Sequence, residues 1–438
     1  MDFTPLAHVF PDTALVNALG RLEIGGLDAV ELADRFGTPL YVLCEDTLRA
    51  RCRAFRAAFQ SLYADTEVAY AAKAYLGPAM ARIIAEEGLG LDVVSGGELA
   101  VARLVEFPAD AIVLHGNNKS VQELAEALDY GVGRVVVDSL HEMDLLARLA
   151  AERGVVQPVL IRVTPGVDPH THAHTTTGVL DSKFGLPIQT GQAGEAVRRA
   201  LALSSLRLTG LHFHLGSPIF DLAPYRDAVD VTLAFAAELR DDGLALDELS
   251  PGGGFAIAYT RDQRAPVPEE YARAIVEAVR EGCERHGLPL PRLMIEPGRS
   301  IVGPAGVALY TVGSIKEVPG VRTYAAVDGG MGDNIRPALY DARYEAVAAS
   351  RMAEEPEHQY AVVGKYCESG DILVREAMLP LLAPGDLLAM PAAGAYAPSM
   401  ASTYNLHPRP PIVLVRGGEA RPVRRRETVE DMVRSDVW

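Results

Sequence analysis

The chain of 438 residues is too long for a lone binding module or a coiled-coil rod, and its length fits one large domain with a smaller partner. Apolar residues make up 49% and charged residues 23%, so the chain can bury a large core and is not expected to be disordered. Acidic residues (58) outnumber lysine and arginine (41), and the net charge of −17 argues against nucleic acid as a partner.

The N-terminal segment and the cysteines predict a cytoplasmic protein. The opening MDFTPLAHVF has no basic region followed by an apolar stretch, so a secretory signal is not expected. No run of about 18 apolar residues is present, so neither a membrane span nor a membrane partner is expected. Cys44, Cys52, Cys283 and Cys367 are scattered without a C-x-x-C pair, which predicts free thiols in a reducing compartment.

Residues 46–308 are predicted to form a (β/α)₈ barrel of the TIM type, an α/β fold. Eight short apolar runs alternate with segments of helical periodicity such as VQELAEALDYG and YARAIVEAVREGCERHG. The runs are VAYAAKA, LGLDVVS, DAIVLHG, RVVVDS, VLIRVTP, LTGLHFHLG, LDELSPGGG and LMIEPGR. Near-continuous apolar strands are typical of a parallel sheet that is covered on both faces. The count of eight favours a closed barrel over an open doubly wound sheet.

Residues 309–438 are predicted to form a second, mostly antiparallel β domain. Short strand-like runs such as GVALYTVGSIKEV, QYAVVGKY and PPIVLVRGG are separated by Gly, Pro and Asp, and most have no long helical stretch between them. Residues 1–45 contain two more short runs, LGRLEIGG and TPLYVL, and are predicted to join this β domain.

Chemically useful residues recur where the predicted barrel strands end, which is where (β/α)₈ enzymes place their reactive groups. They are Lys73, Asp92, His115, Asn117, Arg162, His214, Ser217, Gly252, Gly253, Gly254, Glu296 and Arg299. Each one taken alone could be structural. Their recurrence in phase with the strands predicts a site at one mouth of the barrel.

Three of these features have both a structural and a functional interpretation. Lys73 could extend to the rim of the barrel, or its amine could act as a nucleophile. The triplet Gly252–Gly254 could form a tight turn, or it could offer backbone N–H groups to a phosphate, as loops after the seventh and eighth barrel strands often do. Glu296 could pair with Arg299, or it could keep a cofactor's ring nitrogen protonated.

The histidines also admit two interpretations. His214 could stack on a cofactor or lie in the core. His170, His172 and His174 alternate in HTHAH, but no carboxylate or cysteine follows at ligand spacing, so a solvated loop and no metal site are expected.

Cys367 lies in KYCESGD of the predicted β domain. The negative charges of Glu368 and Asp371 beside it oppose a standing thiolate. This setting suits a proton donor, and a plain buried cysteine is the alternative.

An ordered set of segments resembles the fold-type III pyridoxal-phosphate-dependent decarboxylases, and within them the members that act on diaminopimelate. The segments occur in the family's order from about residue 36 to 415. They are FGTPLYVLCEDTLR, YAAKAY, DVVSGGEL, TPGVDPHTH, DSKFG, HFHLGSPIFD, PGGGF, EPGRSIV, VDGGMGDNIRPALYDARYE, CESGDIL and GAYAPSMASTYNLHPRP. A motif such as GGG is common, but the ordered set is specific.

The resemblance implies a homodimer that binds pyridoxal 5′-phosphate and shares its active site between subunits. It implies a catalytic role for Lys73, which would attach the cofactor, and for the partner's Cys367, which would donate a proton. Residues implied to bind the cofactor are Lys73, His214, Ser217, Gly252, Gly253, Gly254, Glu296, Gly298, Arg299 and Tyr396. Residues implied to bind the substrate are Arg299, Arg336, Tyr340, Glu368 and Tyr396. Asp92 and Arg162 would support the cofactor from behind.

The implied reaction is the decarboxylation of meso-2,6-diaminopimelate to L-lysine and CO2, the last step of lysine biosynthesis. Two arginines and a tyrosine suit a distal carboxylate, whereas they would repel the distal ammonium of ornithine. The alternatives are a decarboxylase for carboxynorspermidine, ornithine or arginine, a racemase, which Glu296 disfavours, and a catalytically silent homologue, which would be expected to lack Lys73 or Cys367. Pro218, Lys365 and Tyr366 depart from the family's usual pattern and bear on substrate preference.

Overall fold

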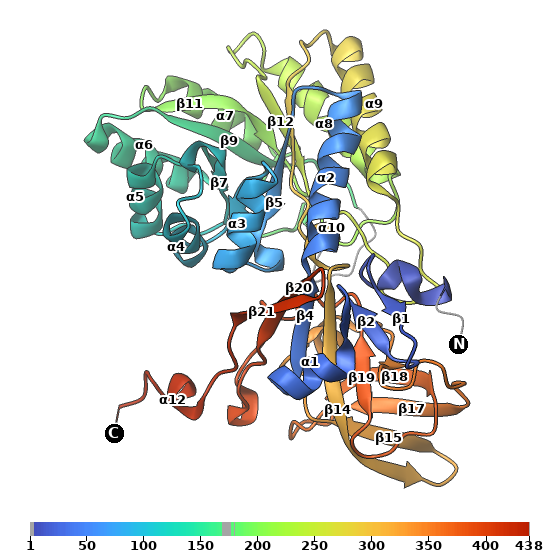
Figure 1. Ribbon diagram of the computed structural model, residues 1–438. Coiled ribbons are helices and arrows are strands. Elements are labelled where there is room, and N and C mark those ends of the chain that lie inside the picture. Colours follow the sequence, from blue (N-terminus) through green and yellow to red (C-terminus); the bar gives the residue numbers. More distant parts are fainter. Residues whose placement is uncertain (1–3, 169–176, 179, 438) are drawn as a thin grey trace. The chain divides into compact units, whose positions relative to one another are not determined.

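The computed structural model describes residues 4–168, 177–178 and 180–437 of the chain, whose contacts divide it into two compact units (Figure 1). The β unit comprises Met1–Arg51, Ile257–Ala265 and Arg299–Trp438, and the barrel unit comprises Cys52–Ala256 and Pro266–Gly298. These contact-based units do not test whether the segments 1–45, 46–308 and 309–438 are separate domains. The predicted domain boundaries therefore stay predictions.

Eight parallel strands close into a barrel, as expected from the eight apolar runs. Around the barrel their order is β9, β11, β12, β13, β5, β6, β7 and β8, and pairing of β8 with β9 completes the circle. The strands are β5 (Thr66–Ala71), β6 (Gly90–Val93), β7 (Ile112–Leu114), β8 (Arg134–Val137), β9 (Gln157–Thr164), β11 (Leu206–His212), β12 (Glu248–Gly252) and β13 (Arg292–Ile295). The predicted (β/α)₈ architecture is therefore confirmed.

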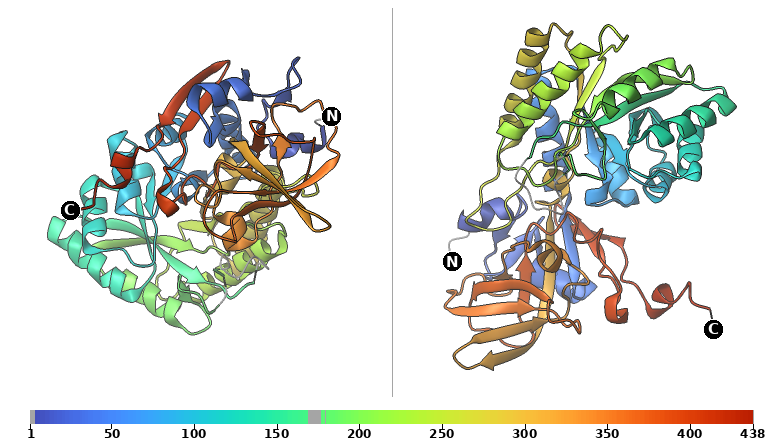
Figure 2. Two further views of the ribbon diagram at one scale, coloured as in Figure 1. Left: turned by 90° about the horizontal axis from the view of Figure 1, so that it is seen from below. Right: turned by 180° about the vertical axis from the view of Figure 1, so that it is seen from behind.

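The barrel strands are covered on both faces, so apolar side chains also fill the inside of the barrel. One buried cluster takes a single side chain from each of four strands: Val113, Val136, Leu160 and Met294. Figure 2 shows the helices of this unit on the outside of the strands. The elements between the barrel strands are η2 (Ala72–Ala74), α3 (Pro78–Glu86), α4 (Gly96–Leu104), η3 (Ala109–Ala111), α5 (Val121–Tyr130), α6 (Leu140–Arg153), β10 (Leu186–Pro187), α7 (Gln192–Ala202), α8 (Ala223–Glu238) and α9 (Pro268–His286).

Local sequence explains where these helices begin and end. Helix α5 begins with a capping box, in which Ser120 and Glu123 satisfy each other's backbone N–H groups. Glycines in the left-handed conformation end α5, α6 and α9 at Gly131, Gly154 and Gly287. Each barrel strand that follows such a stop therefore starts at a defined residue.

The β unit contains a mostly antiparallel sheet in the order β18, β17, β15, β14, β4, β20 and β21, with β16 and β19 paired beside it. Only the pairs β15–β17 and β4–β20 are parallel among its described strands. The sheet strands are β4 (Leu40–Cys44), β14 (Gly306–Val318), β15 (Arg322–Val327), β16 (Val347–Ala348), β17 (His358–Val363), β18 (Ile372–Leu379), β19 (Leu387–Met390), β20 (Ile412–Arg416) and β21 (Glu419–Arg424). The predicted β architecture is confirmed, and β4 shows that the N-terminal segment supplies a strand to it.

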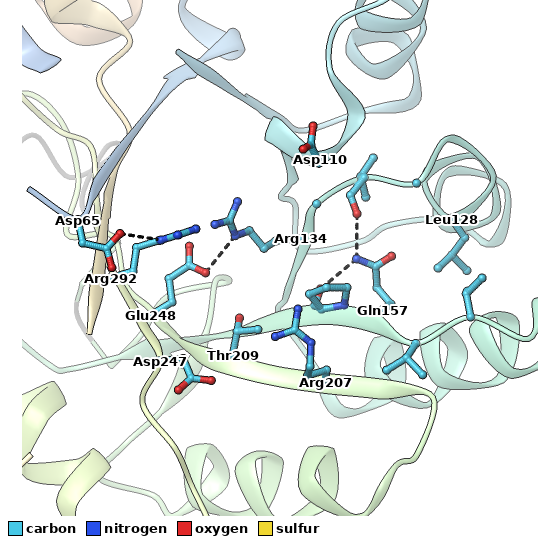
Figure 3. A pocket seen from close by; sticks show the side chains of 16 residues that line it. Asp65, Asp110, Leu128, Arg134, Gln157, Arg207, Thr209, Asp247, Glu248 and Arg292 are labelled. Carbon is cyan, nitrogen blue, oxygen red and sulfur yellow. Dashed lines mark hydrogen bonds and ion pairs between the residues drawn. The ribbon is translucent and has the colours of Figure 1, made fainter. Parts of the chain in front are cut away.

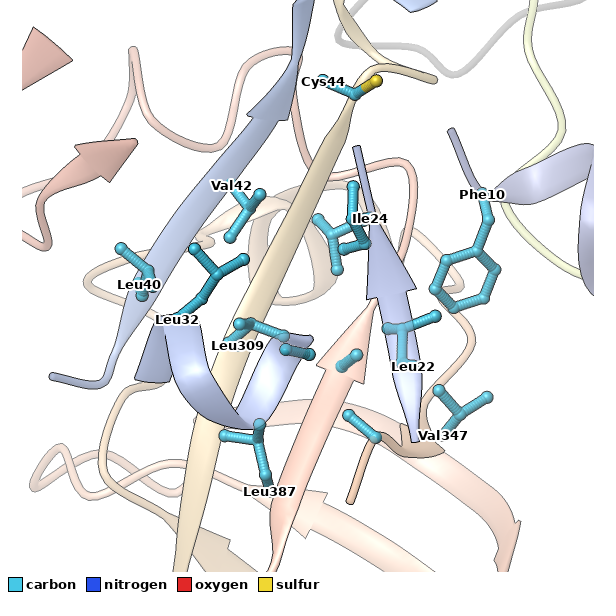
Figure 4. Packing of buried hydrophobic residues seen from close by; sticks show 14 of the residues in the cluster. Phe10, Leu22, Ile24, Leu32, Leu40, Val42, Cys44, Leu309, Val347 and Leu387 are labelled. Carbon is cyan, nitrogen blue, oxygen red and sulfur yellow. The ribbon is translucent and has the colours of Figure 1, made fainter. Parts of the chain in front are cut away.

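Shorter elements complete the β unit. They are η1 (Thr4–Val9), β1 (Leu15–Val16), β2 (Leu22–Ile24), β3 (Leu27–Asp28), α1 (Ala29–Phe36), α10 (Arg299–Val302), α11 (Arg336–Tyr340), η4 (Tyr404–Leu406) and α12 (Val429–Met432), and α2 (Glu45–Leu62) contains residues of both units. Figure 4 shows the core of the β unit, where Phe10, Leu22 and Ile24 pack in one cluster with Leu40 and Leu309. Among the described helices, none is long and apolar enough to span a bilayer.

Candidate active site

Lys73 lies directly after the first barrel strand, in the short turn η2. Its Nζ is 3.5 Å from Oδ2 of Asp92, which lies on the neighbouring strand β6 and is completely buried. The lysine side chain is 39% exposed. An ion pair with a buried carboxylate therefore holds a reachable amine at the C-terminal mouth of the barrel.

Glu296 directly follows strand β13 and is buried among hydrogen-bond donors. Ser250 Oγ donates to its Oε1 over 3.0 Å, and His212 Nε2 lies 3.2 Å from its Oε2. His115 Nε2 lies 3.3 Å from Oε1. Burial acts to raise the pKa of Glu296, but the two histidines outweigh it and hold the pKa well below its usual range. The carboxylate is therefore ionised.

The two histidines beside Glu296 come from different strands. His115 follows β7 and His212 ends β11, and their rings meet edge to face with centroids 4.9 Å apart. Burial lowers the pKa of His212 to about 4, so this imidazole is neutral near pH 7. The nitrogen atoms and the Glu296 carboxylate lie within 4.8 Å of one another, a spacing that a divalent cation would also accept.

The glycine triplet forms a turn that has no space for side chains. A Cβ atom on Gly253 would lie 2.2 Å from the carbonyl oxygen of Glu296, and one on Gly254 would lie 2.4 Å from that of Gly216. Gly252 and Gly254 also have φ values of +72° and +100°, which favour glycine. The turn therefore brings bare backbone to the same end of the barrel as Glu296.

His214 and Ser217 lie on the segment that follows β11, and both are half-buried. The Gly253 N–H donates to Nδ1 of His214 over 3.3 Å. Burial, followed by the positive charges of Lys73 and Arg162, holds the pKa of His214 well below its usual range. The ring is therefore neutral and tied to the glycine turn, and it does not lie wholly inside the core.

Arg162 and Gly298 complete the predicted set in the barrel unit. Arg162 lies on β9, where its Nε is 3.8 Å from Asp138 and its guanidinium lies over the ring of Phe184. A Cβ on Gly298 would lie 2.9 Å from the Cβ of Ala71, which precedes the turn of Lys73. Gly298 thus allows the end of β13 to approach the end of β5.

Two buried arginines lie in the β unit among tyrosine rings. Arg299 begins α10, and its Nη1 donates to Oη of Tyr259 over 2.6 Å. Arg336 begins α11, and its Nη1 donates to Oη of Tyr344. The guanidinium of Arg299 also lies 4.7 Å from the ring centre of Tyr396. The arrangement concentrates two positive charges in a small volume with low exposure.

Tyr340 and Tyr396 are both half-buried in the β unit. Tyr340 is the last residue of α11, the short helix that Arg336 begins. Tyr396 has a φ of +61°, in the left-handed region that a residue with a Cβ adopts at a cost. Residues in such conformations cluster at functional sites, where the surrounding structure holds them.

Cys367 and Glu368 lie in the exposed loop between β17 and β18. Asn405 Oδ1 accepts the backbone N–H of Cys367 over 2.8 Å, which fixes the loop at that point. The alternative of a plain buried cysteine is therefore wrong, because the thiol side of this loop is open in the single chain. The other three cysteines are buried and free.

The residues that depart from the family's pattern have different surroundings. Tyr366 is buried, stacks on Tyr404 and lies with its hydroxyl 3.3 Å from Asp333. Lys365 is exposed and Pro218 is half-buried. His170, His172 and His174 lie outside the described residues, so the expectation of a solvated loop stays a prediction.

Comparison with known proteins assigns the chain to a family. The model of the pyridoxal binding domain of pyridoxal-dependent decarboxylases matches residues 45–303. Diaminopimelate decarboxylase of Bacillus subtilis (strain 168) is 49% identical over 97% of both chains, and that of Mycobacterium tuberculosis (strain H37Rv) is 45% identical over 98% of both. The chain belongs to the diaminopimelate decarboxylase family.

Solved structures of the diaminopimelate decarboxylase family have the same fold. The enzyme from M. jannaschii superposes with a TM-score of 0.92 at 35% identity, covering 98% of each chain. The Helicobacter pylori enzyme, solved with L-lysine, superposes with a TM-score of 0.86 at 30% identity, covering 93% of this chain and 99% of that one. The expected decarboxylase class and pyridoxal-phosphate cofactor are thereby confirmed.

The barrel unit has the chemistry that the family's cofactor requires. A pyridine nitrogen keeps its proton best beside an ionised carboxylate, and Glu296 is buried and ionised. An aldehyde needs an accessible amine, and Lys73 is partly exposed. The glycine turn has room only for backbone, so a phosphate could approach its amides closely. The residues present therefore fit pyridoxal phosphate.

Four members of these clusters are not among the residues predicted from sequence: His212, Ser250, Tyr259 and Tyr344. His212 had a signal, because HFH alternates in a strand and puts His212 and His214 on the same face. Tyr259 and Tyr344 had none, since they approach the arginines from segments 85 positions apart (344 less 259).

A cavity of about 670 Å³ lies at the opposite mouth of the barrel, where the strands begin (Figure 3). Four of its charged residues form pairs: Arg134 donates to Glu248 over 3.0 Å, and Arg292 donates to Asp65 over 3.1 Å. Such mutual pairing is typical of an ion-pair network that holds strand ends together. The active sites of barrels with this fold lie at the other mouth, where the strands end.

Proposed function

We propose that this chain decarboxylates meso-2,6-diaminopimelate to L-lysine and CO2, the last step of lysine biosynthesis. The observation that carries the choice of substrate is the pair of buried guanidinium groups, Arg299 and Arg336, in the β unit. Two such groups attract a distal carboxylate and repel a distal ammonium. Ornithine and arginine, which end in a cation, are therefore poor candidates.

In the barrel unit, each proposed role follows from the local chemistry. Lys73 supplies the amine that attaches the cofactor, and Asp92 holds that amine in place before attachment. Glu296, ionised between its histidines, holds a proton at the ring nitrogen, and His214 lies against the ring. When bound, pyridoxal phosphate accepts the electron pair that remains on the α carbon after CO2 leaves.

The phosphate of the cofactor is proposed to lie among backbone amides and two hydroxyl side chains. These residues are Ser217, Gly252, Gly253, Gly254, Gly298 and Tyr396, with Arg299 nearby in sequence. Arg162, buried and close to Asp138, is proposed to support the site from behind. Their order along the chain matches the family's segments, and the crowded glycines support a role for backbone.

We also propose a homodimer in which each site takes Cys367 and Glu368 from the partner subunit. Cys367 gives a proton to the α carbon after CO2 leaves, and Glu368 binds the distal ammonium of the substrate. The exposure of both residues in the single chain supports this assignment. Arg299, Arg336, Tyr340 and Tyr396 are proposed to hold the distal end of the substrate. A cytoplasmic location stays a prediction.

The test is CO2 release by the purified protein with pyridoxal phosphate. The substrates are meso-diaminopimelate, its L,L isomer, ornithine, arginine and carboxynorspermidine, measured side by side. Turnover of the meso isomer with formation of lysine supports the proposal. Preference for another amino acid overturns the substrate, and no release from any of them favours a silent homologue. Lys73→Ala is expected to abolish turnover, and full activity of that variant would contradict the proposed mechanism.

A further inference from the structure

We propose that Tyr259 is a positioning residue that holds Arg299 and Arg336 ready for a distal carboxylate and thereby sets the preference for substrates that carry one. This inference rests on the proposed function, because it takes the two arginines as the distal subsite. No sequence motif identifies Tyr259 as a functional residue. Its contacts in the β unit identify it.

Tyr259 contacts both arginines at once, through different parts of its side chain. Its hydroxyl accepts a hydrogen bond from Nη1 of Arg299 over 2.6 Å. The face of its ring lies 4.7 Å from the guanidinium of Arg336. All three residues are buried, with exposed fractions of 5–6%. One phenol side chain therefore lies between the two cations.

Tyr344 supports this arrangement from the side. It accepts a hydrogen bond from Arg336, and its ring meets the ring of Tyr259 edge to face, with centroids 5.2 Å apart. The guanidinium of Arg336 is thus held between the phenols of Tyr344 and Tyr259. Among the described residues, no carboxylate lies within ion-pair distance of Arg336.

The electrostatic consequence is a pair of like charges on either side of one neutral phenol. Two buried guanidinium groups repel each other, and the hydroxyl and ring face of Tyr259 offset part of this repulsion. An arriving carboxylate gains from both positive charges, and at Arg336 it meets the neutral phenols of Tyr259 and Tyr344. Because the guanidinium groups are already oriented, the carboxylate also avoids the free-energy cost of ordering them.

The identity of the residue at this position follows from the same argument. A carboxylate here would neutralise both arginines and compete with the substrate. A phenylalanine would keep the ring face for Arg336, but it would lose the acceptor that orients Arg299. Tyrosine combines an acceptor with a ring face and carries no charge when protonated, so it orders the arginines and leaves their charge available.

The test uses two ligands that differ at the distal end. L-Lysine, the proposed product, keeps both the distal carboxylate and the distal amine, and 1,5-diaminopentane (cadaverine) keeps the distal amine without the carboxylate. Calorimetry on the holoenzyme would compare Kd values for both ligands in the wild type, in Tyr259→Phe and in Tyr360→Phe. Tyr360 is a matched control in the same unit, since its hydroxyl also makes one buried hydrogen bond, to the N–H of Leu382.

For Tyr259→Phe, the Kd of L-lysine should rise about tenfold or more, as expected for a lost hydrogen bond to a charged group. The Kd of cadaverine should stay within about twofold of the wild-type value, and both Kd values should be unchanged in Tyr360→Phe. With meso-diaminopimelate, KM should rise and kcat should change little. Equal weakening of both ligands, or no weakening of either, would overturn the role of Tyr259.

A second variant guards against a simple folding defect. Tyr259→Glu places an anion between the arginines, so its thermal stability should be no lower than that of Tyr259→Phe. Its affinity for L-lysine should fall further. Unchanged affinity would contradict the inference. If the wild type releases no CO2 from meso-diaminopimelate, the proposed function fails, while the ratio of the two Kd values still decides the role of Tyr259.

Discussion

His212 and Glu296 face each other inside the barrel, with Nε2 of the histidine 3.2 Å from Oε2 of the glutamate. His212 is neutral near pH 7, because burial lowers its pKa to about 4. A neutral imidazole donates from one nitrogen only, so this contact places the proton on Nε2. His115 adds its own Nε2 at 3.3 Å from the other carboxylate oxygen. The ionised state of Glu296 therefore depends on two residues that need not contact the substrate.

Replacing His212 should weaken the cofactor site. In His212→Phe the ring remains but the donor is lost, so burial raises the pKa of Glu296 and the carboxylate is a poorer partner for a protonated pyridine. We expect the Kd for pyridoxal phosphate to rise and kcat to fall, each by about tenfold, as for a lost charge-assisted hydrogen bond. Fluorescence titration of the apoenzyme measures the Kd for pyridoxal phosphate, and CO2 release measures kcat.

His286→Asn is the control for that experiment, because His286 pairs with Asp230 near the surface of α9. It should leave both quantities unchanged. A His212→Phe protein with normal cofactor affinity and a normal kcat would show that Ser250 and His115 alone suffice to hold Glu296.

The strands could be predicted from sequence far better than the contacts of their side chains. Eight apolar runs predicted eight barrel strands, because a strand buried on both faces reads as a continuous apolar segment. The strand ends likewise located Lys73, His214 and Glu296 at one mouth. Of the partners of Glu296, His115 was among the predicted strand-end residues, but His212 and Ser250 were not. That all three meet Glu296 is set by the closure of the barrel.

In the β unit, even fewer of the side-chain contacts could be predicted from the sequence. Arg299 and Arg336 were identified through their motifs, but the phenols that orient them come from segments without any recognisable pattern. Antiparallel strands and irregular connections bring such segments together by tertiary packing, which a local pattern does not encode. The exposed position of Cys367 was equally hidden, because its loop is held by Asn405, 38 positions further along the chain.

Stability should depend on pH through Asp333. Burial raises the pKa of this carboxyl to about 7, while its neighbours Asp328, Lys365 and Tyr366 adjust it further. The folded state then keeps a proton that the unfolded state, with its ordinary pKa of 3.8, has already lost. Stability therefore falls as the pH rises through 7, by about 1.4 kcal/mol between about pH 6 and pH 8 for this group alone.

Asp333→Asn should remove this dependence. The amide mimics the protonated acid, since its oxygen can still accept the N–H of Gly330 that Asp333 accepts over 2.9 Å. Urea unfolding at both pH values would show a smaller loss of stability in the variant than in the wild type. Equal losses in the two proteins would place the pH dependence on other groups.

Asp371 should control the loop that carries Cys367. Its Oδ1 accepts the N–H of Met331 over 2.6 Å, and its Oδ2 accepts the N–H of Tyr366 over 2.9 Å. Asp371→Ala removes both bonds, and we expect kcat to fall about tenfold or more while cofactor affinity stays normal. Asp386→Ala is the control, because Asp386 also accepts a backbone N–H in a turn of this unit, that of Ala383. A fall in kcat of the same size in both variants would point to general destabilisation.

Binding of a distal carboxylate should weaken at alkaline pH. Burial acts to raise the pKa of Tyr259, but the positive charges of Arg299 and Arg336 outweigh it and the pKa is lowered from its usual value of 10.0. Tyr344 is the other titratable group against this ring.

As the pH rises, a phenolate forms between the two arginines and competes with the ligand for them. The Kd of L-lysine, which keeps the distal carboxylate, should therefore increase with pH more steeply in the wild type than in Tyr259→Phe, which has no phenol at this position. Calorimetric titrations from about pH 7 to pH 9.5 measure both slopes, and because titration of the ligand's own amine is common to the two proteins, parallel slopes would show that Tyr259 does not ionise in this range.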